Sequence, residues 1–555
     1  MRLRRWLVPV LMTALALTAC TSGNGDDPEE RTPLVHQAIN AKPREEMSEG
    51  GELRIAVASL PQTFNPLHTR SSIPGTHTLP YLPSFFSYDQ AGVATPNPDY
   101  VESAEASGSP TVATITLNPK AVWGDGSPLT WQDIAATVQA CKGASPGFQC
   151  AENRFAAVEK VERGANDQQA VVTFTGVQPE WEHVFRGVST LRASSVSSAE
   201  QFNNGWAEPK PEWLSGPFTF DRYDRENKRL TWVPSDKWWG KAPLLQRLTY
   251  KQIAPDATAA AYLNNDVDTF IIGIDPDGQR RAQGAADGDV RTAASGDTRQ
   301  LVFNTRSGPL ADVKVRQAIV AALDRDQIAR TDLEGIEWTP RALNSHVWVE
   351  NHPDFEDVAD KTGLKYDPDR AREILDEAGW VGGEDGIRAK DGNRLTLTFT
   401  TIKGLKASES EGQQIQKMLA DVGIEVKFTE VELNQYSTEE LMTSGKFQML
   451  AVTETGHPSP LLSISRRYTP DTPSNWSGWT SEEFTAVSTE LATEADPDKR
   501  VELGRKADAL LWEAAPAVPL YQLPESVATK RNLANYGAFG LGTPVWPEVG
   551  FTDDR

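Results

Sequence analysis

Two alternating stretches, one on each side of a helix-like segment, decide the fold class: Leu395-Thr-Leu-Thr-Phe399 and Ile424-Glu-Val-Lys-Phe428. Alternation of apolar and polar residues is the period of a half-buried strand. The segment between them favours a helix up to Val422, and Gly423 supplies its end. A strand–helix–strand order predicts an α/β fold with a parallel or mixed sheet.

Strand and helix signals continue on both sides of this unit. Residues 53–57 alternate as a strand does, and residues 218–233 have the pattern of a hairpin. Thr130 followed by Asp133 is typical of a capping box at a helix start. Asp367-Pro368 supplies a cap and a first helical residue for another helix. A chain of 555 residues is too long for one small core, so we expect two or three lobes.

The first nineteen residues have the features of a targeting segment. A basic start (Arg2, Arg4 and Arg5) precedes an apolar run, residues 6–17, which is too short to span a membrane comfortably. The run ends in Leu17-Thr-Ala-Cys20, which resembles a bacterial lipobox. An ordinary secretory peptide or an uncleaved anchor is the alternative. We predict a signal peptide over residues 1–19, a lipid on Cys20, and a place on the outer, extracytoplasmic or periplasmic face of the membrane.

The residues after the lipidation site are rich in Gly, Asp, Glu, Pro and Ser without sustained periodicity. We therefore expect residues 20–49 to form a lipidated, flexible tether, with order beginning at Gly50-Gly51.

Three cysteines are present, and Cys20 is assigned to the lipid. In an exported protein the remaining pair, Cys141 and Cys150, predicts a disulfide, with two free buried thiols as the alternative. The seven histidines show no metal-ligand spacing, so we expect no metal and no cofactor.

Charge and motifs exclude several function classes. The formal charge of −22 becomes −22 − 3 = −25 without the three leader arginines, which disfavours nucleic acid and anionic lipid as partners. The sequence has no nucleophile elbow, zinc-protease helix, phosphate loop or dinucleotide fingerprint. A triad scattered along the chain would escape such a search, but we expect no enzyme.

Several segments together resemble the extracellular solute-binding proteins of family 5, the peptide and nickel receptors of ABC importers. The segments follow one another in the family's order over roughly residues 50–550, and they are Leu117–Thr130, Leu214–Phe218, Trp238–Pro243, Leu263–Asp268, Phe303–Thr305, Val315–Arg325, Tyr366–Trp380 and Pro519–Tyr521. Residues 60–67 and 97–103 resemble an actinobacterial branch, which includes a mycobacterial lipoprotein linked to phosphatidylinositol mannoside and lipomannan synthesis.

The resemblance implies an α/β fold of the type II periplasmic-binding-protein class, with two lobes, a hinge and three domains. Crossing segments near 299–303 and 518–523 form the hinge, and the ligand lies in the cleft between the lobes. The implied division is lobe I over 50–80, 201–299 and 518–555, an inserted domain II over 81–200, and lobe III over 300–517.

The resemblance also assigns candidate ligand-binding residues. Peptide receptors of this family place an Asp four residues before a Pro to bind the ligand's ammonium group. Glu454 occupies that place here, with a solvated loop acid as the alternative. The other candidates have packing or backbone capping as their alternative, and they are Phe64, Asn65, Asn304, Asn475, Trp476, Trp479 and Tyr521.

The predicted function is therefore a lipid-anchored, monomeric receptor that captures peptides or similar small solutes and delivers them to an ABC permease. The alternative is a non-transport role in the cell envelope, binding a glycolipid or a partner in lipomannan-type assembly. The use of Glu in place of Asp at position 454 and the branch resemblance favour that alternative.

Overall fold

The computed structural model describes residues 33–68, 80–143, 147–151, 153–432, 435, 439–456, 459–470, 472 and 474–553. The predicted signal peptide, the lipid site Cys20 and the first part of the predicted tether lie outside the described residues. No helix within these ranges is long and apolar enough to cross a bilayer.

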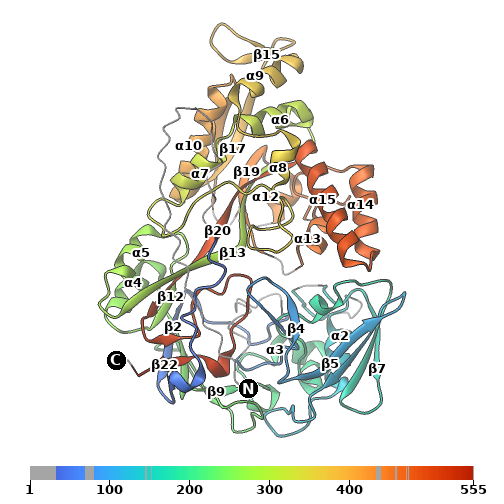
Figure 1. Cartoon of the computed structure of the whole chain (residues 1–555), viewed down its shortest axis with the longest axis vertical. Helices are drawn as coiled ribbons and strands as arrows, with labels where there is room; N and C mark the ends of the chain where they lie inside the picture. The colour runs from blue at the N-terminus through green and yellow to red at the C-terminus, as the bar shows by residue number, and fades with distance from the viewer. Residues whose placement is uncertain are drawn as a thin grey trace, which may run out of the picture. The chain divides into compact units, whose positions relative to one another are not determined.

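A ten-stranded mixed sheet runs through residues 34–555 and organises the fold (Figure 1). In spatial order its strands are β18 (Glu425–Val431), β17 (Thr396–Ile402), β19 (Met449–Glu454), β13 (Gly288–Phe303), β20 (Ala517–Lys530), β12 (Thr269–Ile271), β2 (Glu52–Val57), β11 (Arg247–Gln252), β10 (Arg229–Pro234) and β9 (Phe218–Asp224). The predicted strand–helix–strand unit is present, because β17 and β18 pair in parallel and α10 (Lys406–Ala420) connects them.

Two long strands at the middle of this sheet connect its two ends. β13 and β20 pair in antiparallel fashion along almost their whole length, with register breaks between Ala294 and Thr298 and between Arg299 and Gln300. Figure 1 shows both strands passing from the end that carries α4 and α5 to the end that carries α7 and β17. The predicted crossing segments, 299–303 and 518–523, lie within these two strands.

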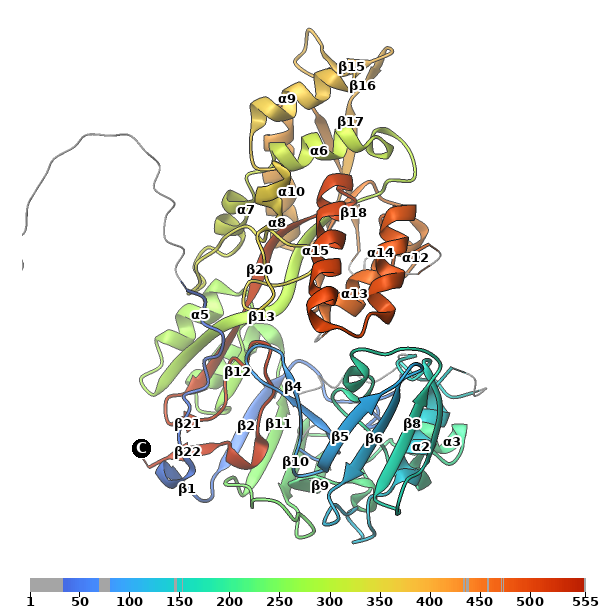
Figure 2. The ribbon, with the colours of Figure 1, turned by 45° about the vertical axis from the view of Figure 1, so that its right-hand side comes forward.

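A separate four-stranded antiparallel sheet lies in the part of the chain predicted as domain II, where α2 packs beside it (Figure 2). Its strands are β5 (Val101–Ser107), β6 (Val112–Leu117), β8 (Gln169–Phe174) and β7 (Val158–Arg163). Thr130 and Asp133 form the predicted capping box of α2 (Trp131–Cys141), in which the Thr130 N–H donates to Asp133 Oδ2 over 3.0 Å. At the end of this helix Cys141 forms a disulfide with Cys150, with Cα atoms 5.7 Å apart.

The remaining elements are short strands and covering helices. The strands are β1 (Met47–Ser48), β3 (Phe86–Tyr88), β4 (Ala94–Pro96), β14 (Val381–Gly382), β15 (Arg388–Lys390), β16 (Asn393–Arg394), β21 (Leu533–Ala534) and β22 (Gly550–Thr552). The helices are α3 (Ala199–Asn204), α4 (Pro255–Leu263), α5 (Pro276–Gln283), α6 (Val313–Ala322), α7 (Arg325–Asp332), α8 (Val358–Thr362), α9 (Pro368–Glu377), α12 (Glu439–Ser444), α13 (Pro460–Arg467), α14 (Glu482–Thr493) and α15 (Pro497–Ala514).

The segment before β2 corrects the predicted tether. Ala38 and Ala538 exchange both backbone hydrogen bonds, of 2.8 and 3.0 Å, and β1 pairs with β22 at the end of the chain. The prediction of a flexible tether up to residue 49 is therefore wrong for residues 38–49. Their order comes from backbone pairing with residues about 500 positions away, which leaves no local periodicity in the sequence.

A buried ionic network ties the crossing strands to the helices beside them. Arg299 of β13 donates two hydrogen bonds, of 3.0 and 2.6 Å, to the carboxylate of Glu411 in α10, whose side chain is 1% exposed. Tyr521 of β20 donates to Asp332 at the end of α7 over 3.1 Å. Burial, reinforced by the negative charge of Glu411, raises the pKa of Asp332 to about 7.

Removing one partner from this network should destabilise the fold strongly. Glu411→Ala removes the buried carboxylate that accepts both hydrogen bonds of the Arg299 guanidinium, so we expect the free energy of unfolding to fall by about 3–5 kcal/mol. Denaturant titration measures this directly. Glu377→Ala is the matched control, because Glu377 pairs with Lys314 on the surface and its loss should leave stability almost unchanged. An equal loss of stability in the two variants would contradict the conclusion that the buried Arg299–Glu411 pair stabilises the fold.

Candidate functional site

A cavity of about 850 Å³ lies beside the crossing strands. Residues from β13 and β20 line it, together with loops from both ends of the large sheet and from the four-stranded sheet's part of the chain. The residues that line it are 66–67, 88, 92, 141, 151, 154–155, 186–188, 271, 273, 295–298, 300, 343, 345–349, 352, 454–456, 460, 463–464, 467, 524–526 and 540–543. The volume is within the range of small-molecule sites in proteins, which is about 300–1,000 Å³.

The first register break of β13 forms part of the cavity wall. The Asp297 N–H donates to Ser295 Oγ over 3.0 Å, and Asp297 Oδ1 accepts the Gly456 N–H over 2.8 Å. Gly296 and Gly456 approach each other so closely that a Cβ on Gly456 would lie 2.5 Å from Gly296. Glycine at both positions therefore brings the loop after β19 against the break in β13.

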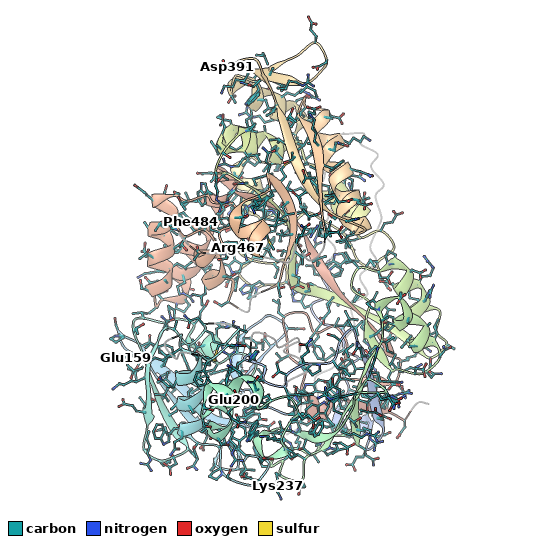
Figure 3. All side chains as sticks on the ribbon, turned by 180° about the vertical axis from the view of Figure 1, so that it is seen from behind. Glu159, Glu200, Lys237, Asp391, Arg467 and Phe484 are labelled. Carbon is teal, nitrogen blue, oxygen red and sulfur yellow. A yellow bond between two sulfur atoms is a disulfide. The ribbon has the colours of Figure 1, made fainter. Side chains whose placement is uncertain are left out.

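Glu454 lines the cavity, as a ligand contact should, but it already has partners within the chain. Gln300 Nε2 donates to its Oε2 over 2.6 Å, and Arg467 donates to the same oxygen. Arg467 is the last residue of α13 (Figure 3). Burial raises the pKa of Glu454, and the Arg467 guanidinium opposes that rise. The carboxylate is thus neutralised by an internal ion pair.

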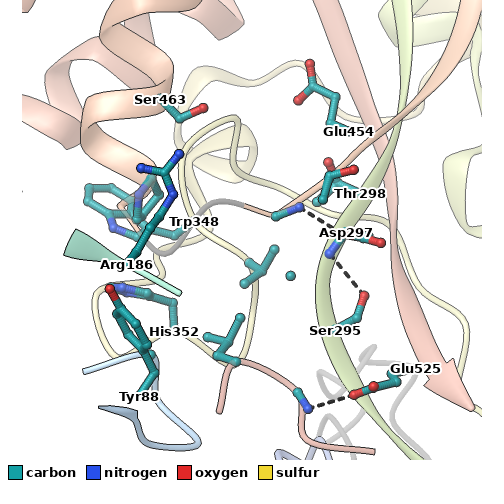
Figure 4. A pocket seen from close by; sticks show the side chains of 18 of the residues that line it. Tyr88, Arg186, Ser295, Asp297, Thr298, Trp348, His352, Glu454, Ser463 and Glu525 are labelled. Atoms are coloured by element: carbon teal, nitrogen blue, oxygen red, sulfur yellow. Dashed lines mark hydrogen bonds between the residues drawn. The ribbon is translucent and has the colours of Figure 1, made fainter. Parts of the chain in front are cut away.

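A second carboxyl group lines the cavity on β20. Glu525 accepts the Gly540 N–H through Oε2 over 2.9 Å. Burial raises the pKa of Glu525 to about 7, and the negative charge of Asp297 contributes to the rise. Figure 4 shows Glu454, Asp297 and Glu525 along one side of the cavity.

The opposite side carries aromatic and basic groups, including Tyr88, Arg186, Trp348 and His352 (Figure 4). His346 also lines the cavity, with its ring edge-on to Trp512 at 4.8 Å between centroids. Its side chain is 6% exposed, and burial lowers its pKa to about 3, so the ring is neutral at pH 7. The cavity therefore presents acids on one side and aromatic, basic or neutral polar groups on the other.

Seven of the eight predicted ligand contacts lie elsewhere. Asn65 Nδ2 donates to the Phe202 carbonyl and Asn304 Nδ2 to the Gly445 and Phe447 carbonyls. Asn475 binds the backbone and hydroxyl groups of its own loop. The four aromatic residues are packed in apolar clusters, and they are Phe64, Trp476, Trp479 and Tyr521. Packing and capping account for each of these residues, and their contact with a ligand stays a prediction.

The other polar groups of the cavity were not predicted from the sequence. Asp297 and Glu525 flank the two crossing segments, so an acid beside each hinge strand was a signal that could have found them. Arg467 lies thirteen residues after Glu454, a distance at which no short-range pattern connects a base with an acid.

Comparison with known proteins now identifies the family. Residues 95–475, more than half of the chain, match the family described as bacterial extracellular solute-binding proteins, family 5 Middle. The oligopeptide-binding protein OppA of Mycobacterium tuberculosis is 31% identical over 98% of this chain and 93% of its own length. The chain belongs to family 5 of the bacterial extracellular solute-binding proteins.

Solved structures agree with the fold of this family 5 protein. A periplasmic EDTA-binding protein, EppA, aligns with a TM-score of 0.82 at 22% identity, covering 94% of this chain and all of its own. The oligopeptide-binding protein AppA of Bacillus subtilis, in complex with a nonapeptide, aligns with a TM-score of 0.72 at 19% identity, covering 91% and 100%. The predicted type II fold, with two lobes and a hinge, is confirmed.

The internal pairing of Glu454 predicts a pH-dependent stability in a variant that lacks Arg467. In Arg467→Met the buried carboxyl loses its counter-charge, and its pKa rises further above the unfolded value. At low pH this carboxyl group is protonated in both the folded and the unfolded chain, so it costs no stability. As pH rises it ionises more easily in the unfolded chain, and the folded state loses stability. We expect the variant to be about 3 kcal/mol less stable than wild type at pH 8, with a smaller difference at pH 5.

Denaturant titration at both pH values measures this effect. The double variant Arg467→Met/Glu454→Gln is the control, because it has no carboxyl to titrate and should lose the added pH dependence. A difference between Arg467→Met and wild type that is the same at pH 5 and pH 8 would argue against the pairing.

Proposed function

We propose that this protein captures peptides, or similar small solutes, in the cavity and delivers them to an ABC permease without catalysing a reaction. The cavity itself carries the proposal, because its acidic side and its aromatic and basic side complement a molecule with both charges and an apolar body. Kinship with the mycobacterial OppA, an oligopeptide-binding protein, supports the same solute class.

The crossing strands give this capture a mechanism. We propose that the chain divides into lobe I, domain II and lobe III at the bounds predicted from the sequence. In this proposal lobe III, residues 300–517, closes onto the rest of the molecule when β13 and β20 bend near their register breaks. A contact between predicted lobe III and predicted domain II supports this arrangement, because Arg500 of α15 pairs with Glu180 over 2.9 Å. Burial raises the pKa of Glu180, and the Arg500 charge opposes the rise.

A lipid on Cys20 would hold the monomeric receptor at the outer face of the membrane. Ala38, Met47 and Ser48 pair with the C-terminal part of the chain, so the ordered body begins well before residue 50. We propose that the lipid keeps the cavity close to a membrane permease and raises its effective concentration there.

Ligand binding should appear as thermal stabilisation. We expect a peptide at about 100 times its dissociation constant to add roughly 2.7 kcal/mol to the stability of the folded protein. A melting screen with a library of short peptides measures the shift. Ser463→Trp should abolish it, because Ser463 lines the cavity and an indole would fill the ligand's space.

Ala492→Trp is the matched control, because Ala492 is exposed on α14, outside the residues that line the cavity, and the peptide-induced shift should persist. Absence of any shift with wild type across the library would count against peptide capture.

The Arg500–Glu180 ion pair should slow ligand release. Arg500→Gln removes a contact that joins predicted lobe III to predicted domain II in this structure, so under the proposed closure the open state becomes more populated. We expect a roughly tenfold faster dissociation rate, about 1.4 kcal/mol, with little change in the association rate. Stopped-flow fluorescence with a bound peptide measures both rates. Unchanged dissociation would show that the pair does not hold the closed state.

A further inference from the structure

The three carboxylates of the cavity differ in the charges around them. Glu454 shares one oxygen between Arg467 and Gln300, so the protein already supplies its counter-charge. Asp297 and Glu525 accept backbone N–H groups, from Gly456 and Gly540. Within the described ranges, no basic side chain forms an ion pair with either of these two acids. An ammonium group that enters the cavity would therefore compete with Arg467 at Glu454, but not at Glu525.

Glu525 is placed where a cation would offset the cost of burial. An ionised carboxylate in a poorly hydrated site is unfavourable unless a counter-charge accompanies it. The pKa of Glu525, raised to about 7 by burial and by the charge of Asp297, is a consequence of that missing counter-charge. Together the carboxylates of Glu525 and Asp297 make this part of the cavity favourable for a single positive charge.

Two further side chains of the same cavity point to the rest of the ligand. His346 is 6% exposed, and neither of its ring nitrogens has a hydrogen-bond partner among the described residues. Gln300 is 3% exposed, and within the same part of the chain its Oε1 has no partner, although its Nε2 donates to Glu454. Each unpaired buried polar atom has lost its hydrogen bonds to water without replacing them, which is unfavourable. A ligand with N–H and C=O groups beside Gln300 and His346 would remove that cost.

We propose that the ligand's primary ammonium binds at Glu525, under the added negative charge of Asp297, and that Gln300 and His346 bind the amide groups that follow. Glu454 then acts with Arg467 as a neutral pair in the cavity wall and not as the ammonium acceptor. This assignment rests on the proposed function, and it refines it to peptides with a free amino terminus. The strand from Ser295 to Gln300 spans about 15 Å, which suits an extended peptide of about four residues.

Calorimetric titration of the full protein with tetra-alanine and with N-acetyl-tetra-alanine tests the assignment. Acetylation removes the ammonium charge and keeps the amide groups. We expect wild type to bind the free-amine peptide at least tenfold more tightly. Glu525→Gln should lower affinity for tetra-alanine at least tenfold and abolish the preference. The double variant Arg467→Met/Glu454→Gln removes the neutral ion pair as a whole, and it should keep the preference within threefold of wild type.

Two more variants guard against a folding defect. Glu525→Asp keeps the charge and should restore most of the preference, and Asp297→Asn should reduce it by about threefold because the second negative charge is lost. A preference that disappears in Arg467→Met/Glu454→Gln and persists in Glu525→Gln would overturn the assignment while leaving peptide capture intact. Failure of wild type to bind either peptide would instead count against peptide capture itself, and the assignment would fall with it.

Discussion

The pairing of β13 with β20 is the interaction on which the rest of the structure depends. These two strands hold the two ends of the large sheet together, and the breaks in their register put Ser295, Asp297 and Thr298 into the cavity wall. Regular pairing would give stiffness without a cavity, since each break removes ladder hydrogen bonds and bends the strand. The buried Arg299–Glu411 pair lies between the two breaks and ties β13 to α10.

The cavity follows from that geometry and from a division of charge. Acids lie along the crossing strands and the loop after β19, whereas aromatic and basic groups come from the loops opposite (Figure 4). Because Arg467 neutralises Glu454 internally, Asp297 and Glu525 are the acids of this side without an ion-pair partner among the described residues. In the proposed assignment, Arg467 on α13 therefore decides which acid is left to bind a positive charge.

Caps and periodicity in the sequence predicted many of the helices and strands. Order that comes from pairing between distant parts of the chain could not be predicted from such local signals. Asp367 caps its helix by accepting the Arg370 N–H over 2.9 Å, and β17, α10 and β18 follow in the predicted order, because caps and periodicity act within a few residues. Residues 38–49 are ordered by the far end of the chain, so composition alone made them look like a tether. The family resemblance correctly indicated that Glu454 lines the cavity. It could not show that Arg467 pairs with Glu454 and neutralises its charge, because the two residues meet only in the folded chain.

Native mass spectrometry of the protein after mild purification is the most direct test of the central claim that the cavity captures peptides. The account predicts a mass increment that dissociates on activation into short peptides with unmodified amino termini, and that is absent from the Ser463→Trp variant. Retention of a glycolipid in the wild-type protein, or an increment unaffected by filling the cavity, would contradict it.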